Sequence, residues 1–289
     1  MPPFIFTNIL SLIDIKNLIV DFEVADADGV ALSKKRVLND ITLSIDDGEF
    51  VSILGKNGSG KSTLAKCLNA LILPTSGDVE ILGLNTKDEK NLMSIRQNVG
   101  MTFQNPDNQI VSSIVEEDIA FGLENLGIET EEMKARIDTA MRSIGILDLR
   151  NSMVSKLSGG QKQKVSIAGI LAMKPKIIVL DEPTSMIDKS SRVDLLNTVK
   201  YLNEHENITV ILISHYVEEI MYGKRTIVLN DGRIIADDIP SEILLRKDIL
   251  DFAGIDMPYI PKLATELKNL GKKLKGNETK VESLCQYLK

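Results

Sequence analysis

A glycine-rich stretch at residues 55–62 has the spacing of a phosphate-binding loop. It lies between a short apolar segment and a segment rich in leucine and alanine, and it reads Gly55-Lys56-Asn57-Gly58-Ser59-Gly60-Lys61-Ser62. In such a loop the backbone N–H groups surround the β-phosphate of a nucleotide, and the following helix contributes its positive end. We expect Lys61 to reach the β- and γ-phosphates, the Ser62 hydroxyl to bind Mg²⁺, and Thr63 to complete the nucleotide-binding residues. A glycine-rich turn with an incidental lysine is the weaker interpretation, because the strand and helix that this motif requires are both predicted.

Two carboxylates follow a strand predicted at residues 177–180. Asp181 and Glu182 come directly after this apolar run, and in an open parallel sheet ligands gather beyond the carboxyl ends of the strands. We expect Asp181 to hold Mg²⁺, directly or through a water molecule, and Glu182 to orient and polarise the attacking water. Without the phosphate-binding loop, two solvated carboxylates at a strand end would be an equally good interpretation. Together the two motifs predict that the chain binds and hydrolyses ATP.

Gln104 and His215 end two further apolar segments in the same way. A lone histidine is more often structural than catalytic, and the second histidine of the chain, His205, lies in a polar segment. Because the ends of parallel strands meet at one edge of a sheet, we nevertheless expect these side chains to converge on the same crevice. Gln104 is then a candidate ligand of Mg²⁺ and water, and His215 is a candidate contact to the γ-phosphate.

A second glycine motif, Ser158-Gly159-Gly160-Gln161, opens a helix predicted at residues 162–173. Ser158 and Gln161 also fit a Ser-x-x-Gln capping box, which is a purely structural explanation. Capping does not explain two glycines in the first turn, since glycine disfavours a helix. Glycines at a helix N-terminus do allow a phosphate to approach closely. The chain therefore has two phosphate-contacting helix starts and only one phosphate-binding loop.

The elements that must position these residues alternate between strands and helices. Continuous β-branched and leucine runs at residues 177–180 and 208–213 are typical of central parallel strands buried on both faces, and residues 130–146 have the apolar spacing of a helix. The other predicted strands span residues 11–24, 36–46, 50–54, 78–83, 98–104, 227–229 and 233–236, and the other predicted helices 62–73, 162–173, 241–252, 262–274 and 280–288. This order predicts an α/β nucleotide-binding fold with a small helical extension from about residue 240.

Composition restricts the class of protein further. The 289 residues carry 34 basic and 41 acidic side chains, a formal charge of −7, so no nucleic acid partner is expected. The two cysteines, Cys67 and Cys285, are far apart and lack the spacing of a metal site. No apolar run reaches the ~20 residues needed to cross a bilayer, and the N-terminus makes a poor signal peptide. We therefore expect a weakly acidic cytoplasmic enzyme.

In this order along the chain, the motifs resemble those of the ATPase subunit of ATP-binding-cassette (ABC) transporters. The resemblance covers about residues 12 to 240 and rests on the phosphate-binding loop, Gln104, Leu157–Gln161, residues 177–182, Ser185–Asp188 and His215. It implies a P-loop NTPase fold with a mixed core sheet, an antiparallel β subdomain and a helical subdomain at about residues 105–172. It also implies a head-to-tail dimer, in which Ser158–Gln161 of one subunit close over ATP on the other subunit's loop. By the same resemblance Phe22 stacks on adenine and Asp188 communicates across the dimer.

A narrower resemblance is to the ATPases of energy-coupling-factor transporters. It rests on residues 103–110, residues 115–122, residues 64–70 and the tail of about 50 residues. Such proteins drive uptake of vitamins or of cobalt and nickel, commonly as two related ATPases on a shared membrane subunit, and this chain is more similar to the first of that pair. The resemblance implies a peripheral protein on the cytoplasmic face of the membrane, with residues 1–240 as the ATP-binding domain and 241–289 as a dimer-contacting extension. The implied partners are a second ATPase (a paralogue or a second copy), the membrane coupling subunit and a substrate-binding membrane subunit.

Two other functions compete with the importer interpretation. A soluble ABC-type ATPase of DNA repair or translation would carry a long coiled-coil insertion or two cassettes in one chain, and neither is visible. A metabolic P-loop kinase would leave Ser158–Gln161 unexplained. The acidic run Glu116-Glu117-Asp118 could complement basic helices of a membrane subunit, although a solvated helix face explains it equally well.

Overall fold

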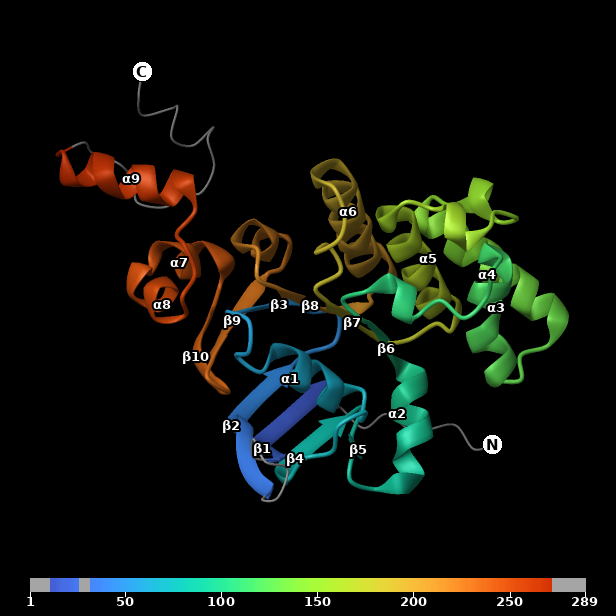
Figure 1. Ribbon diagram of the computed structural model, residues 1–289, viewed down its shortest axis with the longest axis horizontal. Coiled ribbons are helices and arrows are strands. Elements are labelled where there is room, and N and C mark those ends of the chain that lie inside the picture. Colours follow the sequence, from blue (N-terminus) through green and yellow to red (C-terminus); the bar gives the residue numbers. More distant parts are fainter. Residues whose placement is uncertain (1–10, 26–31, 272–289) are drawn as a thin grey trace.

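A six-stranded mixed sheet lies at the centre of the computed structural model, which describes residues 11–25 and 32–271 (Figure 1). The strand order is β10-β9-β3-β8-β7-β6. Five strands run parallel and β10 (Arg233–Asp238) returns antiparallel beside β9; the parallel strands are β3 (Phe50–Leu54), β6 (Val99–Thr102), β7 (Ile177–Asp181), β8 (Thr209–Ser214) and β9 (Arg225–Asn230). The carboxyl ends of the parallel strands therefore share one edge, as the strand-end motifs predict.

A separate antiparallel sheet of four strands lies beside the central sheet (Figure 1). Its order is β2-β1-β4-β5, formed by β1 (Ile13–Ala25), β2 (Leu32–Ile45), β4 (Ser76–Ile81) and β5 (Leu84–Asn85). Helix α1 (Lys61–Leu68) is packed against strands of both sheets, and its Leu64, Ala65, Cys67 and Leu68 belong to a core shared with them. Burial raises the pKa of the Cys67 thiol to about 12, so this cysteine is a small apolar core residue, as predicted.

Helices cover the other face of the central sheet. A second core joins this face to α3 (Val115–Asn125), α4 (Thr130–Ile144), α5 (Gly159–Ala172) and α6 (Lys189–Glu206). β7 shows why its sequence is apolar throughout: Ile177 and Val179 enter the first core, whereas Ile178 and Leu180 enter the second. The prediction of central strands buried on both faces is therefore confirmed.

The helical part of the chain on the right of Figure 1 consists of α3, α4 and α5, with α6 beside it. α5 packs on both α3 and α4. Helix α2 (Leu92–Asn98) precedes β6, and short 3₁₀ turns connect the larger elements at Glu89–Asn91, Pro106–Asn108, Leu147–Leu149, Val154–Lys156 and Val217–Tyr222. Within the described residues no helix is both long and apolar enough to span a membrane.

Three short helices follow β10: α7 (Pro240–Leu245), α8 (Lys247–Phe252) and α9 (Tyr259–Asn269). The first two pack on the end of the central sheet, where Ile243 and Leu250 share a third core with Leu54 and Val228. The prediction of one helix over residues 241–252 is wrong, because the backbone leaves the helical region at Arg246 (φ −89°, ψ 81°). The helix predicted at 262–274 begins earlier, at Tyr259, and the one predicted at 280–288 lies outside the described residues.

Two other predicted helices end earlier than expected. Helix α1 stops at Leu68 rather than at residue 73, since Ala70 has a φ of +54° and the Lys66 carbonyl accepts hydrogen bonds from the Leu71 and Ile72 N–H groups. Helix α4 stops at Ile144 because Gly145 adopts the left-handed conformation that commonly ends helices.

Candidate functional site

The glycine-rich loop joins β3 to α1 and depends on two left-handed glycines. Gly58 and Gly60 have φ values of +81° and +104°, in a region where L side chains are rare. Gly60 is the N-cap of α1, so the free N–H groups of the first helical turn open onto the loop. The loop borders a cavity of about 290 Å³ lined by Val37, Asn57, Gly58, Gly60, Lys61, Ser62, Thr63, Gln104 and Glu182.

Three predicted nucleotide-binding residues shape this loop without lining the cavity. Gly55 lies so close to β9 that a Cβ there would be 2.4 Å from the Leu229 carbonyl oxygen. The Ser59 side chain is fully buried, and the Lys56 ammonium lies 3.4 Å from the Asp231 carboxylate. These residues support the loop in the state that the structure describes.

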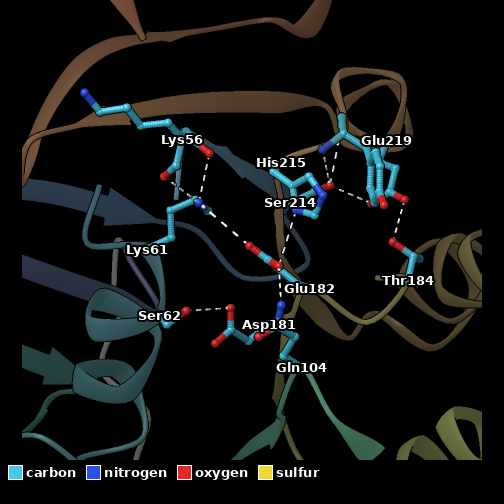
Figure 2. Close-up of polar contacts among 12 residues, drawn as sticks. Lys56, Lys61, Ser62, Gln104, Asp181, Glu182, Thr184, Ser214, His215 and Glu219 are labelled. Carbon is cyan, nitrogen blue, oxygen red and sulfur yellow. Dashed lines mark hydrogen bonds and ion pairs between the residues drawn. The ribbon is translucent and has the colours of Figure 1, made fainter. Parts of the chain in front are cut away.

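Lys61 is folded back onto its own loop. Its Nζ donates hydrogen bonds to the carbonyl oxygens of Gly55 (2.8 Å) and Lys56 (3.0 Å), and it lies 3.9 Å from Glu182 Oε1 (Figure 2). The side chain is only 4% exposed. Burial lowers the pKa of Lys61, and the nearby carboxylates of Glu182 and Asp181 oppose that change. The Lys61 ammonium is therefore held by two neutral carbonyl oxygens of the loop. An anionic phosphate forms stronger hydrogen bonds with an ammonium group and can replace them.

The acidic pair comes from the end of β7, as predicted. The Ser62 hydroxyl donates a 3.1 Å hydrogen bond to Asp181 Oδ1 (Figure 2). Burial raises the pKa of Asp181, while this hydrogen bond from Ser62 lowers it. A buried carboxylate that is costly to ionise is a site where a cation is favourable.

The Glu182 carboxylate is the point where the predicted strand-end residues meet. Gln104 Nε2 donates a 2.9 Å hydrogen bond to its Oε2, and His215 Nδ1 lies 3.3 Å from the same oxygen without the geometry of a hydrogen bond. The other oxygen faces Lys61. Side chains from α1 and from the segments after β6 and β8 thus surround this carboxylate, which itself directly follows β7 (Figure 2).

Glu182 also has an unusual backbone. Its φ is +49°, a conformation that costs a non-glycine residue about 1–3 kcal/mol and that clusters at active sites. The Glu182 N–H donates to the Ile213 carbonyl of the neighbouring strand. The positive φ sets the direction of the Glu182 side chain at the end of β7. Contacts with the surrounding residues must offset the energetic cost of this backbone conformation.

The second glycine motif lies apart from the loop of its own chain. α5 begins at Gly159, and Ser158 and Gln161 form the predicted capping box. Ser158–Gln161 are absent from the described residues that line the cavity at the glycine-rich loop. The structure also gives the two glycines a packing role: a Cβ on Gly159 would lie 2.9 Å from the Met186 carbonyl oxygen, and one on Gly160 would lie 3.0 Å from Ser191 Cβ.

The remaining predicted residues occupy separate positions. Asp188 is the N-cap of α6, where its Oδ1 accepts hydrogen bonds from Ser190 and Ser191. Phe22 lies on β1 and is 38% exposed. Sequence reasoning missed Val37 in the cavity wall, since one residue of a predicted strand carries no signal of that kind. It also missed the buried carboxylate of Glu219 beside the site.

The acidic run on α3 is partly engaged within the chain. Asp118 Oδ1 accepts hydrogen bonds from the N–H groups of Val111 and Ser112, and Glu117 accepts one from the Ser112 hydroxyl. All three acidic residues lie in the first turn of α3, where carboxylates stabilise a helix. These contacts give the run a local structural role beside any docking role.

Comparisons with known proteins show the family of the chain. The family model described as "ABC transporter" matches residues 38–185. The energy-coupling factor transporter ATP-binding protein EcfA1 of Caldanaerobacter subterraneus is 48% identical over 87% of this chain and 91% of its own length. The Clostridium novyi protein of the same name is 45% identical over 96% of this chain and 98% of its own length.

Solved structures similar to this chain also belong to ABC-type ATP-binding proteins. The cbiO1 protein of Clostridium perfringens, part of the ABC transporter complex cbiONQ, matches with a TM-score of 0.74 and 30% identity over 88% of this chain and 99% of that one. An ATP-binding cassette solved as a dimer in a post-hydrolysis state with ADP and phosphate bound matches with a TM-score of 0.71 and 30% identity, over 79% of this chain and 98% of that one. The chain therefore belongs to the ABC transporter family, as the ATP-binding and ATP-hydrolysing subunit of an energy-coupling-factor type importer.

Proposed function

We propose that Glu182 is the general base that activates water for attack on the γ-phosphate of ATP. The observation that carries this proposal is the position of its carboxylate, which lies among Lys61, Gln104 and His215 at the border of the cavity. A carboxylate beside the phosphate-binding loop can accept the proton of the attacking water. Lys61 then stabilises the negative charge on the transferred phosphoryl group.

Ser62 and Asp181 are the residues that would hold Mg²⁺. Their oxygens are 3.1 Å apart, and hydroxyl and carboxylate oxygens are the hard ligands that this ion prefers. Among the described residues no group of three or more His, Cys, Asp or Glu side chains could hold a metal. At nucleotide sites Mg²⁺ commonly has one or two protein ligands, and phosphate oxygens and water complete its coordination. The ion would supply positive charge to the phosphates.

Gln104 and His215 control the same carboxylate in this proposal. In the described state Gln104 donates to Glu182 Oε2, so one lone pair of the base is already used. With ATP bound, Gln104 would be a further candidate to hold Mg²⁺ and its water, and the His215 ring would donate a hydrogen bond to the γ-phosphate. Gln104 lies two residues after the last paired residue of β6, and His215 directly follows β8, so the sheet holds the backbone next to both side chains.

The site is completed by a second subunit. Ser158–Gln161 of one chain lie at a helix N-terminus, where the N–H groups can bind the γ-phosphate of ATP held by the other chain. Asp188 would face the partner, Phe22 would stack on adenine, and the extension from residue 241 would add contact area between subunits. The head-to-tail arrangement explains why one chain has two phosphate-binding helix starts.

The names of the relatives, which describe ATP-binding proteins of energy-coupling factor transporters, support a set of transport partners. We propose that the chain binds the cytoplasmic side of a membrane coupling subunit, together with a second ATPase and a substrate-binding membrane subunit. The cargo, a vitamin or a transition-metal ion, would be selected by that last subunit. ATP-driven closure of the ATPase dimer would then move the coupling subunit.

Replacing Glu182 by Gln tests the central proposal. The amide keeps the acceptor oxygen for Gln104 but cannot take a proton, so ATP turnover should fall by about 10²–10⁴-fold. The ATP affinity should stay within about threefold, and the ATP-bound dimer should persist in gel filtration. Glu204→Gln, on an exposed turn of α6, is the matched control and should leave turnover unchanged. Turnover of Glu182→Gln within tenfold of the parent would overturn the assignment of the base.

A further inference from the structure

A second buried carboxylate lies behind the proposed catalytic residues. Glu219 belongs to the 3₁₀ turn Val217–Tyr222 and is 2% exposed. Its Oε1 accepts a 2.6 Å hydrogen bond from the Thr184 hydroxyl, and its Oε2 accepts a 2.7 Å hydrogen bond from the Ser214 hydroxyl (Figure 2). A carboxylate this deeply buried is costly unless each oxygen is paired, and here both oxygens are.

The two hydroxyl groups belong to the segments that carry Glu182 and His215. Thr184 follows Glu182 by two residues, and Ser214 directly precedes His215. Ser214 Oγ also accepts a hydrogen bond from the Tyr216 N–H (2.8 Å), which fixes the turn on the other side of His215. One carboxylate therefore links the backbone on which the proposed base stands to the backbone on which the histidine stands.

A third segment reaches the same carboxylate from α6. Arg192 Nε lies 3.5 Å from Glu219 Oε1, and the guanidinium lies 3.9 Å above the Tyr216 ring. Arg192 is four residues from the α6 N-cap, Asp188. The ion pair keeps a positive charge beside Glu219 and joins the start of α6 to the two other segments.

We propose that Glu219 is a positioning residue for ATP hydrolysis, which sets His215 against Glu182 by tying the segments after β7 and β8 to each other. The Glu182 backbone is strained, with a φ of +49°, so its direction depends on restraint from neighbouring segments. His215 Nδ1 and Glu182 Oε2 are already 3.3 Å apart, and a small relative shift of the two segments would change this distance. Glu219 does not line the cavity at the phosphate-binding loop, so it acts through Thr184 and Ser214. This inference rests on the proposed roles of Glu182 and His215.

The test is a set of substitutions measured in the full chain. Glu219→Gln keeps the size and one acceptor oxygen but loses the charge that faces Arg192, and we expect turnover to fall about tenfold. The KM for ATP should stay within about twofold, because the phosphate-binding loop, which holds the nucleotide, is unchanged. Glu219→Asp, which retains the charge on a shorter side chain, should recover part of the lost turnover. Glu218→Gln is the control: it is adjacent in the chain and exposed, and it should leave turnover and KM unchanged.

A double substitution separates positioning from general stabilisation. If Glu219 acts through His215, Glu219→Gln should reduce the single-turnover rate of hydrolysis by less than about twofold in a chain that also carries His215→Ala. The same tenfold loss in both backgrounds would overturn the proposal and leave Glu219 as a structural ion pair. Thr184→Val removes one of the two hydroxyl contacts and leaves the Glu219 carboxylate in place. It therefore tests the connection between the two segments if the Glu219 variants do not fold. It should lower turnover several-fold with an unchanged KM, and normal turnover would also overturn the proposal.

Two sets of variants distinguish the positioning role of Glu219 from the catalytic roles of Glu182 and His215. If Glu182→Gln and His215→Ala kept near-normal turnover, the catalytic roles themselves would be wrong. If those two variants were inactive while Glu219→Gln and Thr184→Val were normal, only the positioning role would be lost. Both sets of variants are measured in the same ATPase assay.

Discussion

Replacing Gly60 by Ala should destabilise the nucleotide-free protein far more than the same change at Gly58. Both glycines have positive φ, +81° at Gly58 and +104° at Gly60, so each alanine pays for a left-handed backbone. At Gly58 that is the only cost, because no atom lies within 4 Å of the position of the new Cβ. We expect a loss of about 1–2 kcal/mol in the free energy of unfolding for Gly58→Ala.

The Gly60 position adds crowding to the backbone strain. A Cβ there would lie 2.8 Å from Leu38 Cδ2 and 3.0 Å from the Val37 carbonyl oxygen. The leucine methyl group can shift, whereas the carbonyl belongs to β2 of the antiparallel sheet and can shift only with its strand. Backbone strain of about 1–3 kcal/mol and overpacking of about 1–3 kcal/mol together predict a loss of about 2–6 kcal/mol for Gly60→Ala.

Urea denaturation without nucleotide measures both variants under the same conditions. A difference of about 2 kcal/mol between them corresponds to a midpoint shift of about 1 M urea at a slope of about 2 kcal/mol/M. The absence of nucleotide matters, because both glycines border the cavity and ligand binding would mix two effects. Equal urea midpoints for the two variants would show that the Val37 carbonyl can move away from the new Cβ without loss of stability. Crowding at Gly60 would then be refuted as a source of destabilisation.

Lys61→Ala should lower the affinity for ATP by about 10²-fold in a fluorescent-nucleotide titration, since a charge-assisted contact to phosphate is worth about 1.5–3 kcal/mol. Asp181→Asn should raise the Tm of the nucleotide-free, metal-free protein at neutral pH. Burial raises the pKa of Asp181, so the ionised carboxylate destabilises the fold above that pKa, and the gain should shrink in thermal melts as the pH falls through it. Ser158→Ala should cost about 1 kcal/mol in urea unfolding, because the capping box of α5 is lost. Glu116→Lys combined with Glu117→Lys should abolish transport by the assembled complex while basal ATPase activity persists; unchanged assembly and transport would exclude a docking role for the acidic run.

The sequence predicts the centre of this fold better than its margins. Continuous apolar runs identify β7 and β8, and parallel topology then brings Gln104, Glu182 and His215 together, because only one edge of a sheet holds the carboxyl ends of its parallel strands. Helix ends are less predictable. α1 stops early when Ala70 adopts a positive φ, and residues 241–252 break at Arg246, although neither residue type is a helix breaker.

The hydrogen-bond network around Glu219 is not predictable from the sequence, for a different reason. Thr184, Ser214 and Glu219 come from three segments separated by up to 35 positions in the chain, and no spacing in the sequence indicates that these three side chains meet. A buried carboxylate is visible in a sequence only when its environment is known, since glutamate is otherwise an ordinary surface residue. The partners of Glu219 therefore become apparent only in the folded chain.

The two glycines that open α5 carry two requirements at once. Within one chain they allow α5 to pack against Met186 and Ser191, so their presence alone does not prove contact with a phosphate. The position of these residues supports a composite site more strongly than their presence does. Ser158–Gln161 are not among the described residues that line the cavity of their own chain, while their helix N-terminus has the N–H groups that bind anions. If one chain can cover its own nucleotide, a Ser158→Arg variant mixed with a Lys61→Ala variant should show no turnover at all. If the site is shared, each mixed dimer keeps one site with an intact Lys61 and an intact Ser158 from different chains, and the mixture should recover hydrolysis that neither variant has alone.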